Sequence, residues 1–220
     1  MVNGEWEIIH YQEHFLHLTF HLSQNNMRKT RLEAFSDGVI AIIITIMVLE
    51  LKVPEGATWQ ALQPLIPVFL SYVLSFIFIG IYWNNHHHLM HLVKRISAGI
   101  MWANLNLLFW LSLVPFATAW VGENHFEPFP VALYAILFDL CGIAYTILQV
   151  TIERCHKDDE DLKNIMLRQK GKGIGSLFLY TAAIPLAYVS TTISGVLFII
   201  VAIIWIVPDK KIERLSRGED

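Results

Sequence analysis

The sequence predicts an all-α membrane protein with six transmembrane helices per chain. Of its 220 residues, 55% are hydrophobic and only 16% are charged, whereas soluble domains carry about 25% charged residues. Six apolar windows are long enough, or nearly so, to cross a hydrocarbon core about 30 Å thick. The basic residues gather in alternate connections between these windows. We therefore expect the chain to fold in a lipid bilayer.

The six windows follow one another with short connections. They are residues 36–52, 64–83, 99–121, 129–151, 174–191 and 193–208. The last two share the segment Ser190–Gly195, which predicts a helical hairpin. Prolines at 115, 130 and 185 are expected to start or kink helices. The organisation is thus an N-terminal extension (1–27), a six-helix transmembrane domain (28–208) and a charged tail (209–220).

The orientation follows from lysine and arginine, which favour the cytoplasmic side of a membrane. All of the 16 basic residues except Lys52 lie before the first window, between windows two and three, between windows four and five, or in the tail. We therefore expect both termini to face the cytoplasm. The net charge of −3 gives no indication of a nucleic-acid partner.

Residues 1–27 allow three interpretations. Four histidines are spaced by four, three and four residues, which places them on one face of any helix formed there; they are His10, His14, His17 and His21. They could bind a metal or sense pH, or the segment could be an amphipathic interfacial helix or a disordered tail. Alternatively, Met27 is the true start, since Arg28 and Lys29 follow it at once.

The first window combines an apolar run with polar residues at its entrance. It begins "RLEAFSD" (Arg31–Asp37), and Thr45 lies within the run. Ile42, Thr45 and Leu49 are spaced by three and four residues, so they share one helical face. A hydroxyl in lipid gains nothing without a partner, so this face is expected to look inward. Alternatively, Thr45 only bonds to a carbonyl one turn earlier.

The pattern R-x-x-x-F-S-D resembles the signature of the transmembrane protein 175 family, bacterial and lysosomal potassium channels. It is formed by Arg31, Phe35, Ser36 and Asp37, and a looser likeness covers residues 28–208. The resemblance implies a homotetrameric channel in a bacterial plasma membrane, with the first helices lining a central pore for K⁺ and no cofactor. It also implies that Ile42, Thr45 and Leu49 form an apolar constriction with a hydroxyl layer.

The polar entrance is expected to have a structural and gating role. Ser36 is a candidate helix N-cap, and unpaired amides at a helix N-terminus favour a carboxylate such as Asp37. The second window ends in "YWNNHHHLMHLVKR" (Tyr82–Arg95), which lies on the same side. His87 or His91 is a possible scaffold partner of Asp37.

Other polar residues allow further interpretations. His86–His91 could bind zinc or haem in a membrane-embedded enzyme, although no metal site is predicted. Asp139 in the fourth window is a functional candidate by default, but a buried hydrogen bond to Asn104 or Asn106 is favoured. A secondary transporter is disfavoured because the sequence shows no internal repeat. No T-V-G-Y-G filter loop occurs.

Overall fold

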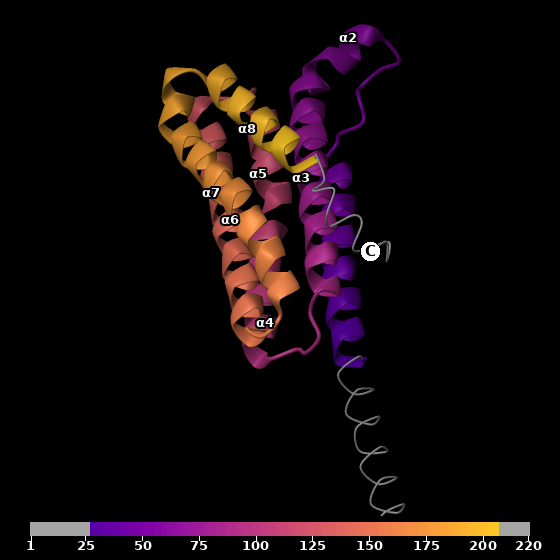
Figure 1. The fold of residues 1–220 in the computed structure, drawn as a ribbon. Helices are drawn as coiled ribbons and strands as arrows, with labels where there is room; N and C mark the ends of the chain where they lie inside the picture. Colours follow the sequence, from indigo (N-terminus) through magenta and orange to yellow (C-terminus); the bar gives the residue numbers. More distant parts are fainter. Residues whose placement is uncertain (1–26, 207–220) are drawn as a thin grey trace, which may run out of the picture.

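A computed structural model describes residues 27–206 as a bundle of α-helices (Figure 1). The elements are a first helix (Met27–Leu49), α2 (Trp59–Leu62), a 3₁₀ turn η1 (Gln63–Leu65), α3 (Ile66–His91), α4 (Ala98–Ser112), α5 (Val114–Glu123), α6 (Pro128–Cys155), α7 (Glu160–Val189) and α8 (Thr191–Ile206). The interpretations of residues 1–26 and 207–220 lie outside the described residues.

The described helices agree with the predicted membrane class. Five of them are long and apolar enough to cross a membrane, counting α2 to α3 and α4 to α5 as one each, and α8 is a shorter apolar helix of 16 residues. At 1.5 Å per residue α8 measures roughly 24 Å, less than the hydrocarbon thickness. The all-helical membrane fold is therefore confirmed, and the six predicted windows correspond to five helices of spanning length and one shorter apolar helix.

Several helix ends differ from the prediction. The first helix is already formed at Met27, and α3 continues past the end of the apolar window at residue 83 to His91. The third window is divided at Leu113 into α4 and α5. Pro115 follows that division directly and has no N–H to continue the hydrogen-bond ladder. Apolar length alone does not show these polar extensions.

Helix α7 begins at Glu160, within the charged connection between the fourth and fifth windows. Asp159 caps it by accepting a hydrogen bond from the Leu162 amide at 3.1 Å. With 30 residues, α7 is roughly 45 Å long, so its first third extends beyond a bilayer core. At its other end the chain turns at Ser190 and re-enters a helix at Thr191 (Figure 1). The turn is therefore shorter than the predicted Ser190–Gly195.

One end of the bundle collects the basic connections. Lys29 Nζ donates to the carbonyl of His91 at 3.0 Å, and Lys94 pairs with Asp159 at 2.7 Å. The Lys94 hydrogen bond lowers the pKa of the Asp159 carboxyl below its ordinary value. His156 Nε2 accepts from the Lys94 amide at 3.2 Å. The starts of the first helix and α7 and the end of α3 therefore lie on one side.

The remaining basic residue lies at the opposite end. Lys52, just after the first helix, pairs with Glu123 at the end of α5 at 2.7 Å. The hydrogen bond that Lys52 donates to the Glu123 carboxylate raises the pKa of the Lys52 ammonium. Helices α3 and α5 also approach closely here, because a Cβ on Gly122 would lie 2.6 Å from the backbone of Val68.

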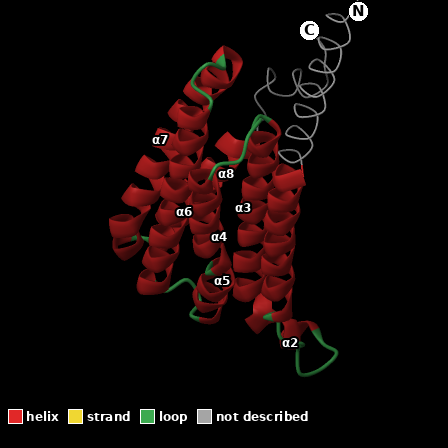
Figure 2. Ribbon diagram, turned by 90° about the horizontal axis from the view of Figure 1, so that it is seen from below, coloured by secondary structure: helices red, strands yellow, loops and turns green. Residues whose placement is uncertain are grey.

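The core between α3, α6, α7 and α8 is aromatic. The ring centroid of Phe78 lies 4.6 Å from that of Phe138, which in turn lies 4.7 Å from Tyr134, and Phe198 of α8 closes the group 5.1 Å from Tyr134. Tyr180 of α7 packs against the same rings. Figure 2 shows the first helix on the far side of α3 from α6 and α7. The first helix is thus added to the edge of a packed unit.

Candidate functional site

The first helix has one buried face and one exposed face. Its buried residues recur every three or four positions and pack against α3, α4 and α5. They are Leu32, Ser36, Ile40, Ile43 and Met47, each 9% exposed or less. This spacing is the one that places side chains on a single side of an α-helix. The chain therefore fixes which face of the helix is left uncovered.

The predicted stripe lies on the uncovered face. Ile42 is 58% exposed and Leu49 is 80% exposed, and Thr45 between them is also exposed. The Thr45 hydroxyl donates to the carbonyl of Ile42 at 2.8 Å, as the alternative interpretation of this residue expected. The helix satisfies the hydroxyl's proton, and the two lone pairs of its oxygen stay available. The single chain therefore presents a row of two apolar residues with one hydroxyl.

The signature residues divide between the two faces. Arg31 and Phe35 precede Ile42 by eleven and seven residues, so they continue the exposed row, and Phe35 is 52% exposed. Ser36 points to the buried face, and Asp37 lies at the edge of the contact with α3. Ser36 and Asp37 of the signature therefore contact the rest of the chain, whereas Arg31 and Phe35 are exposed on its surface.

A buried chain of hydrogen bonds joins the first helix to α3 and α4. His86 Nε2 lies 2.7 Å from Asn104 Oδ1, Asn104 Nδ2 donates to Ser36 Oγ at 2.9 Å, and Ser36 donates to the Leu32 carbonyl at 2.9 Å. Because the amide oxygen can only accept, His86 carries its proton on Nε2. His86, Asn104 and Ser36 are 1%, 0% and 0% exposed. Each link thus satisfies a polar group that would otherwise be unpaired in the membrane.

This chain corrects the expected role of Ser36. Ser36 is not an N-cap, because the helix is already formed nine residues earlier, at Met27. Its hydroxyl holds the first helix against α4 instead. Sequence reasoning placed Ser36 at the start of the helix because the apolar run starts there, and the preceding polar turns gave no apolar signal.

Asp37 has a different partner from the one expected. Trp83 Nε1 of α3 donates to Asp37 Oδ1 at 3.0 Å. His87 and His91 contact each other, with their Nε2 atoms 3.0 Å apart, and the His87 ring stacks on Trp83 at 5.9 Å. Within residues 27–206 neither histidine bonds to Asp37. The two histidines are therefore linked to Asp37 indirectly, because His87 packs on the Trp83 indole that donates to Asp37.

Asp139 also has a different partner. Its Oδ2 accepts a hydrogen bond from Thr181 of α7 at 3.0 Å, and its Oδ1 is buried with no partner in the described structure. The expected partner Asn104 is engaged by His86 and Ser36. Asp139 thus joins α6 to α7, away from the first helix.

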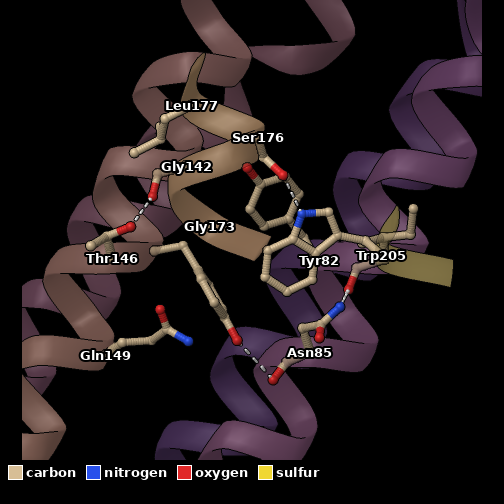
Figure 3. A pocket seen from close by; sticks show the side chains of 11 residues that line it. Tyr82, Asn85, Gly142, Thr146, Gln149, Gly173, Ser176, Leu177 and Trp205 are labelled. Carbon is tan, nitrogen blue, oxygen red and sulfur yellow. Dashed lines mark hydrogen bonds between the residues drawn. The ribbon is translucent and has the colours of Figure 1, made fainter. Parts of the chain in front are cut away.

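A small pocket lies between α3, α6, α7 and α8 (Figure 3). Its volume is about 40 Å³, enough for one or a few water molecules. The Trp205 indole donates to Ser176 at 2.7 Å across it, and Tyr145 donates to the Asn85 carbonyl at 3.2 Å. The residues that line it all come from α3, α6, α7 and α8, so the pocket is separate from the exposed row.

The polar contact between the first helix and α3 is tested by two changes at Asp37. Asp37→Ala removes the acceptor of Trp83 and should lower the melting temperature by about 2–4 °C, if the bond is worth about 1 kcal/mol. Asp37→Asn keeps an oxygen acceptor and should cost less. Melting in detergent measures both, with exposed Asp158→Ala as control. Equal losses for Ala and Asn would show that the charge, not the indole bond, is what matters.

Together the apolar helices and the buried polar chain define an α-helical integral membrane protein whose first helix exposes a nearly apolar row. Residues 31–115 match the family described as "Endosomal/lysosomal potassium channel TMEM175". A potassium channel of Chryseobacterium sp. (strain P1-3) is 53% identical over 188 residues, which are 86% of this chain and 97% of the relative. The chain belongs to the TMEM175 family.

More distant relatives extend the comparison. A potassium channel of Chamaesiphon minutus is 34% identical over 77% of this chain and 90% of its own length. The crystal structure of a lysosomal potassium-selective channel TMEM175 homolog from Chamaesiphon minutus matches with a TM-score of 0.70 and 29% identity, over 81% of this chain and 96% of that chain. Human TMEM175, named an endosomal/lysosomal proton channel, is 36% identical over 38% of this chain and 19% of its own.

Sequence reasoning missed several residues that the structure brings together. Trp83 and His86 were not identified as partners of the signature, and Asn104 was assigned to Asp139. Their common signal is a polar side chain inside an apolar window, because such a group needs a partner in lipid. Which of these polar residues bond to one another depends on how the helices pack, which the sequence alone does not show.

Proposed function

We propose that the chain forms a homotetrameric potassium-selective channel with the first helices around a central pore lined by Ile42, Thr45 and Leu49. The basic end of the bundle then faces the cytoplasm of a bacterial cell, with both termini on that side. The observation that carries the proposal is the uncovered row on the first helix, opposite the face that the chain buries. The names of the relatives support potassium as the permeant ion.

The composition of the exposed row favours a position that lines a pore, rather than one that faces lipid. A purely lipid-facing surface has no use for a hydroxyl, whereas Thr45 Oγ1 keeps lone pairs that can meet water or an ion. Ile42 and Leu49 on either side are apolar and exposed. In a tetramer, four copies of each would form two apolar rings with a hydroxyl ring between them.

Selection then depends on partial dehydration. An apolar ring offers no ligands, so an ion must shed part of its hydration shell to pass, and K⁺ holds its water less tightly than Na⁺. The hydroxyl ring would compensate part of that loss. Apolar constrictions can also close by dewetting. We therefore expect moderate selectivity and a pore that is closed when its narrow part is dry.

Arg31, Phe35, Ser36 and Asp37 serve as the scaffold of this pore in the proposal. Ser36 and Asp37 hold the first helix to α4 and α3 through Asn104 and Trp83, which leaves the opposite face free for neighbouring copies. His87 supports Trp83 by stacking, and His91 packs edge-on against His87. The membrane-enzyme alternative has no support from the relatives, whose names describe channels.

The proposal is tested by ion flux through the purified protein in liposomes. Vesicles loaded with K⁺ should release it when a proton carrier balances the charge, and Na⁺-loaded vesicles should release their ion more slowly. Cross-linking and mass measurement in mild detergent should give four chains. Absence of flux above that of protein-free vesicles, or a particle of one chain, would refute the proposal.

Thr45→Ala tests the hydroxyl ring. The expected result is a lower preference for K⁺ over Na⁺ with current retained, because the apolar rings remain. The stability should change little, because the hydroxyl bonds only to its own helix. Reversal potentials under K⁺ and Na⁺ gradients measure the preference. Thr151→Ala, which removes a hydroxyl that also bonds to its own helix on α6, is the matched control, and unchanged potentials in Thr45→Ala would remove Thr45 from the filter.

A further inference from the structure

Besides the chain of His86, Asn104 and Ser36, a buried cluster of three hydroxyls packs against the first helix. It is formed by Ser75 of α3, Thr118 of α5 and Tyr134 of α6. Ser75 Oγ lies 2.8 Å from Tyr134 OH and 2.7 Å from Thr118 Oγ1, and Thr118 Oγ1 lies 2.7 Å from the Val114 carbonyl oxygen. The three side chains are 0%, 4% and 3% exposed. Three helices are thus joined by polar contacts in an apolar environment.

Thr118 is the donor in two of these contacts. Its single hydroxyl proton is directed toward Ser75 Oγ and the Val114 carbonyl oxygen, each 2.7 Å from Thr118 Oγ1. The Ser75–Tyr134 bond completes the cluster, and either hydroxyl can donate in it. Removing any one hydroxyl leaves a buried neighbour without its partner, in a membrane where no water replaces it.

The cluster touches the first helix at Met47. Thr118 Oγ1 lies 4.0 Å from the Met47 sulfur, and Met47 is 2% exposed. Met47 is two residues from Thr45 and two from Leu49, and therefore points to nearly the opposite side of the helix from both. The hydroxyl cluster thus contacts the buried face of the first helix, at the level of Thr45 and Leu49 on the exposed face.

We infer that Ser75, Thr118 and Tyr134 are positioning residues for ion selection, which set the rotation and depth of the first helix through Met47. This inference rests on the proposed pore. The row formed by Ile42, Thr45 and Leu49 projects from a helix whose polar supports at Ser36 and Asp37 lie about three turns before Met47. The Lys52–Glu123 ion pair at the other end is exposed and lies after the last turn of the helix. The hydroxyl cluster therefore gives buried support to the part of the helix that Ser36 and Asp37 do not reach.

The cluster was not evident from sequence because its three hydroxyls come from three different apolar windows. Ser75, Thr118 and Tyr134 are 43 to 59 residues from their hydrogen-bonding partners. A lone membrane serine or threonine commonly bonds to its own helix, as Thr146 does here. Their convergence depends on the close approach of α3 and α5 at Gly122.

Thr118→Val tests the inference because valine keeps the shape of threonine and removes the hydroxyl. Reversal potentials of the full-length channel in liposomes should show the K⁺/Na⁺ permeability ratio lowered about threefold, the factor that the loss of one average interhelical membrane hydrogen bond would give. Thr118→Ser should restore the wild-type ratio. Thr151→Val, which removes a hydroxyl bonded only to its own helix, should leave the ratio unchanged.

A second pair of variants follows the path through the first helix. Met47→Leu keeps an apolar side chain and removes the sulfur contact, so it should lower the ratio in the same direction. Combined with Thr118→Val it should add little, because both act on one contact. If Thr118→Val yields no channel, Tyr134→Phe replaces it and should also lower the ratio.

Two outcomes separate this inference from the proposed function. A wild-type protein without K⁺ flux would refute the channel itself, and with it the inference. A selective wild-type channel whose ratio is unchanged in Thr118→Val, or in Tyr134→Phe where Thr118→Val is not recovered, would overturn the inference alone. A loss of thermal stability without a change in the ratio would assign the cluster to folding only, which also overturns it.

Discussion

Ile42→Asn is expected to raise the Na⁺ flux of the channel and to reduce its preference for K⁺ severalfold. Ile42 is exposed on the first helix one turn before Thr45, where the proposed pore would be narrowest. Asparagine has nearly the same length but carries an amide that can hold water and coordinate an ion. A hydrated ring no longer requires an ion to shed its shell, so the dehydration difference between the two ions is lost.

The same change should also affect opening. An apolar constriction can close by dewetting, and four amides would keep it wet. In Ile42→Asn, ion flux down a concentration gradient should therefore persist under conditions that close the wild-type channel. Liposome flux with K⁺ and Na⁺, and reversal potentials in planar bilayers, measure both effects.

Ile199→Asn is the matched control for this prediction. Ile199 lies on α8 and is 51% exposed, close to the 58% of Ile42. It carries the same chemical change on a helix that the proposal keeps away from the pore. Equal fluxes in Ile42→Asn and wild type, for both ions, would show that Ile42 faces lipid and would place the pore elsewhere.

The fold class could be predicted because a membrane helix is recognised from the length of an apolar segment and from the polarity of its flanks. Apolar windows of about 20 residues identify helices whichever way they pack, and segregated lysine and arginine divide the connections into two sets. Both patterns are local in the sequence. The structure places Lys29 and Lys94 at one end of the bundle and Lys52 at the other, in line with the division of the connections.

The faces of the first helix could also be predicted, because a period of three and four residues is read directly from the chain. Ile42, Thr45 and Leu49 share the exposed side, as the spacing requires. The partners of the polar residues could not be predicted in the same way. Asp37 has a tryptophan partner, although the nearby histidines were expected. An indole N–H and an imidazole N–H satisfy a carboxylate equally well, and only the rotation of α3 decides between them.

The helix ends were wrong where polar residues are buried by neighbouring helices. The segment Met27–Asp37 is polar enough to read as a flank, but Ser36 is fully buried against α4. A hydropathy window registers the polar side chain and not its partner. Asn104, 68 residues along the chain from Ser36, supplies that partner. Such long-range pairs are the part of this site that single-sequence reasoning does not reach.

Asn104→Ala is expected to give the largest loss of stability among single changes in the buried polar chain. The Asn104 side chain is 0% exposed, accepts from His86 and donates to Ser36. Its removal leaves the His86 N–H and the Ser36 oxygen unpaired, and an unsatisfied buried group costs about 1–3 kcal/mol. Two such groups at the lower end of this range total about 2 kcal/mol, which corresponds to a fall in melting temperature of roughly 4–8 °C for a chain of this size.

Asn106→Ala separates this effect from the loss of an asparagine on α4 in general. Asn106 lies two residues away and is only partly buried, so its replacement should leave the melting temperature within about 1 °C of wild type. Combining Asn104→Ala with Ser36→Ala should cost less than the sum of the two, because the residues share one hydrogen bond. Additive losses would mean that Ser36 is held by the Leu32 carbonyl alone, and that the link from α4 to the first helix contributes nothing. Recovery of assembled channel should fall with the melting temperature, since a first helix that is free to rotate cannot present Ile42, Thr45 and Leu49 to its neighbours in one register.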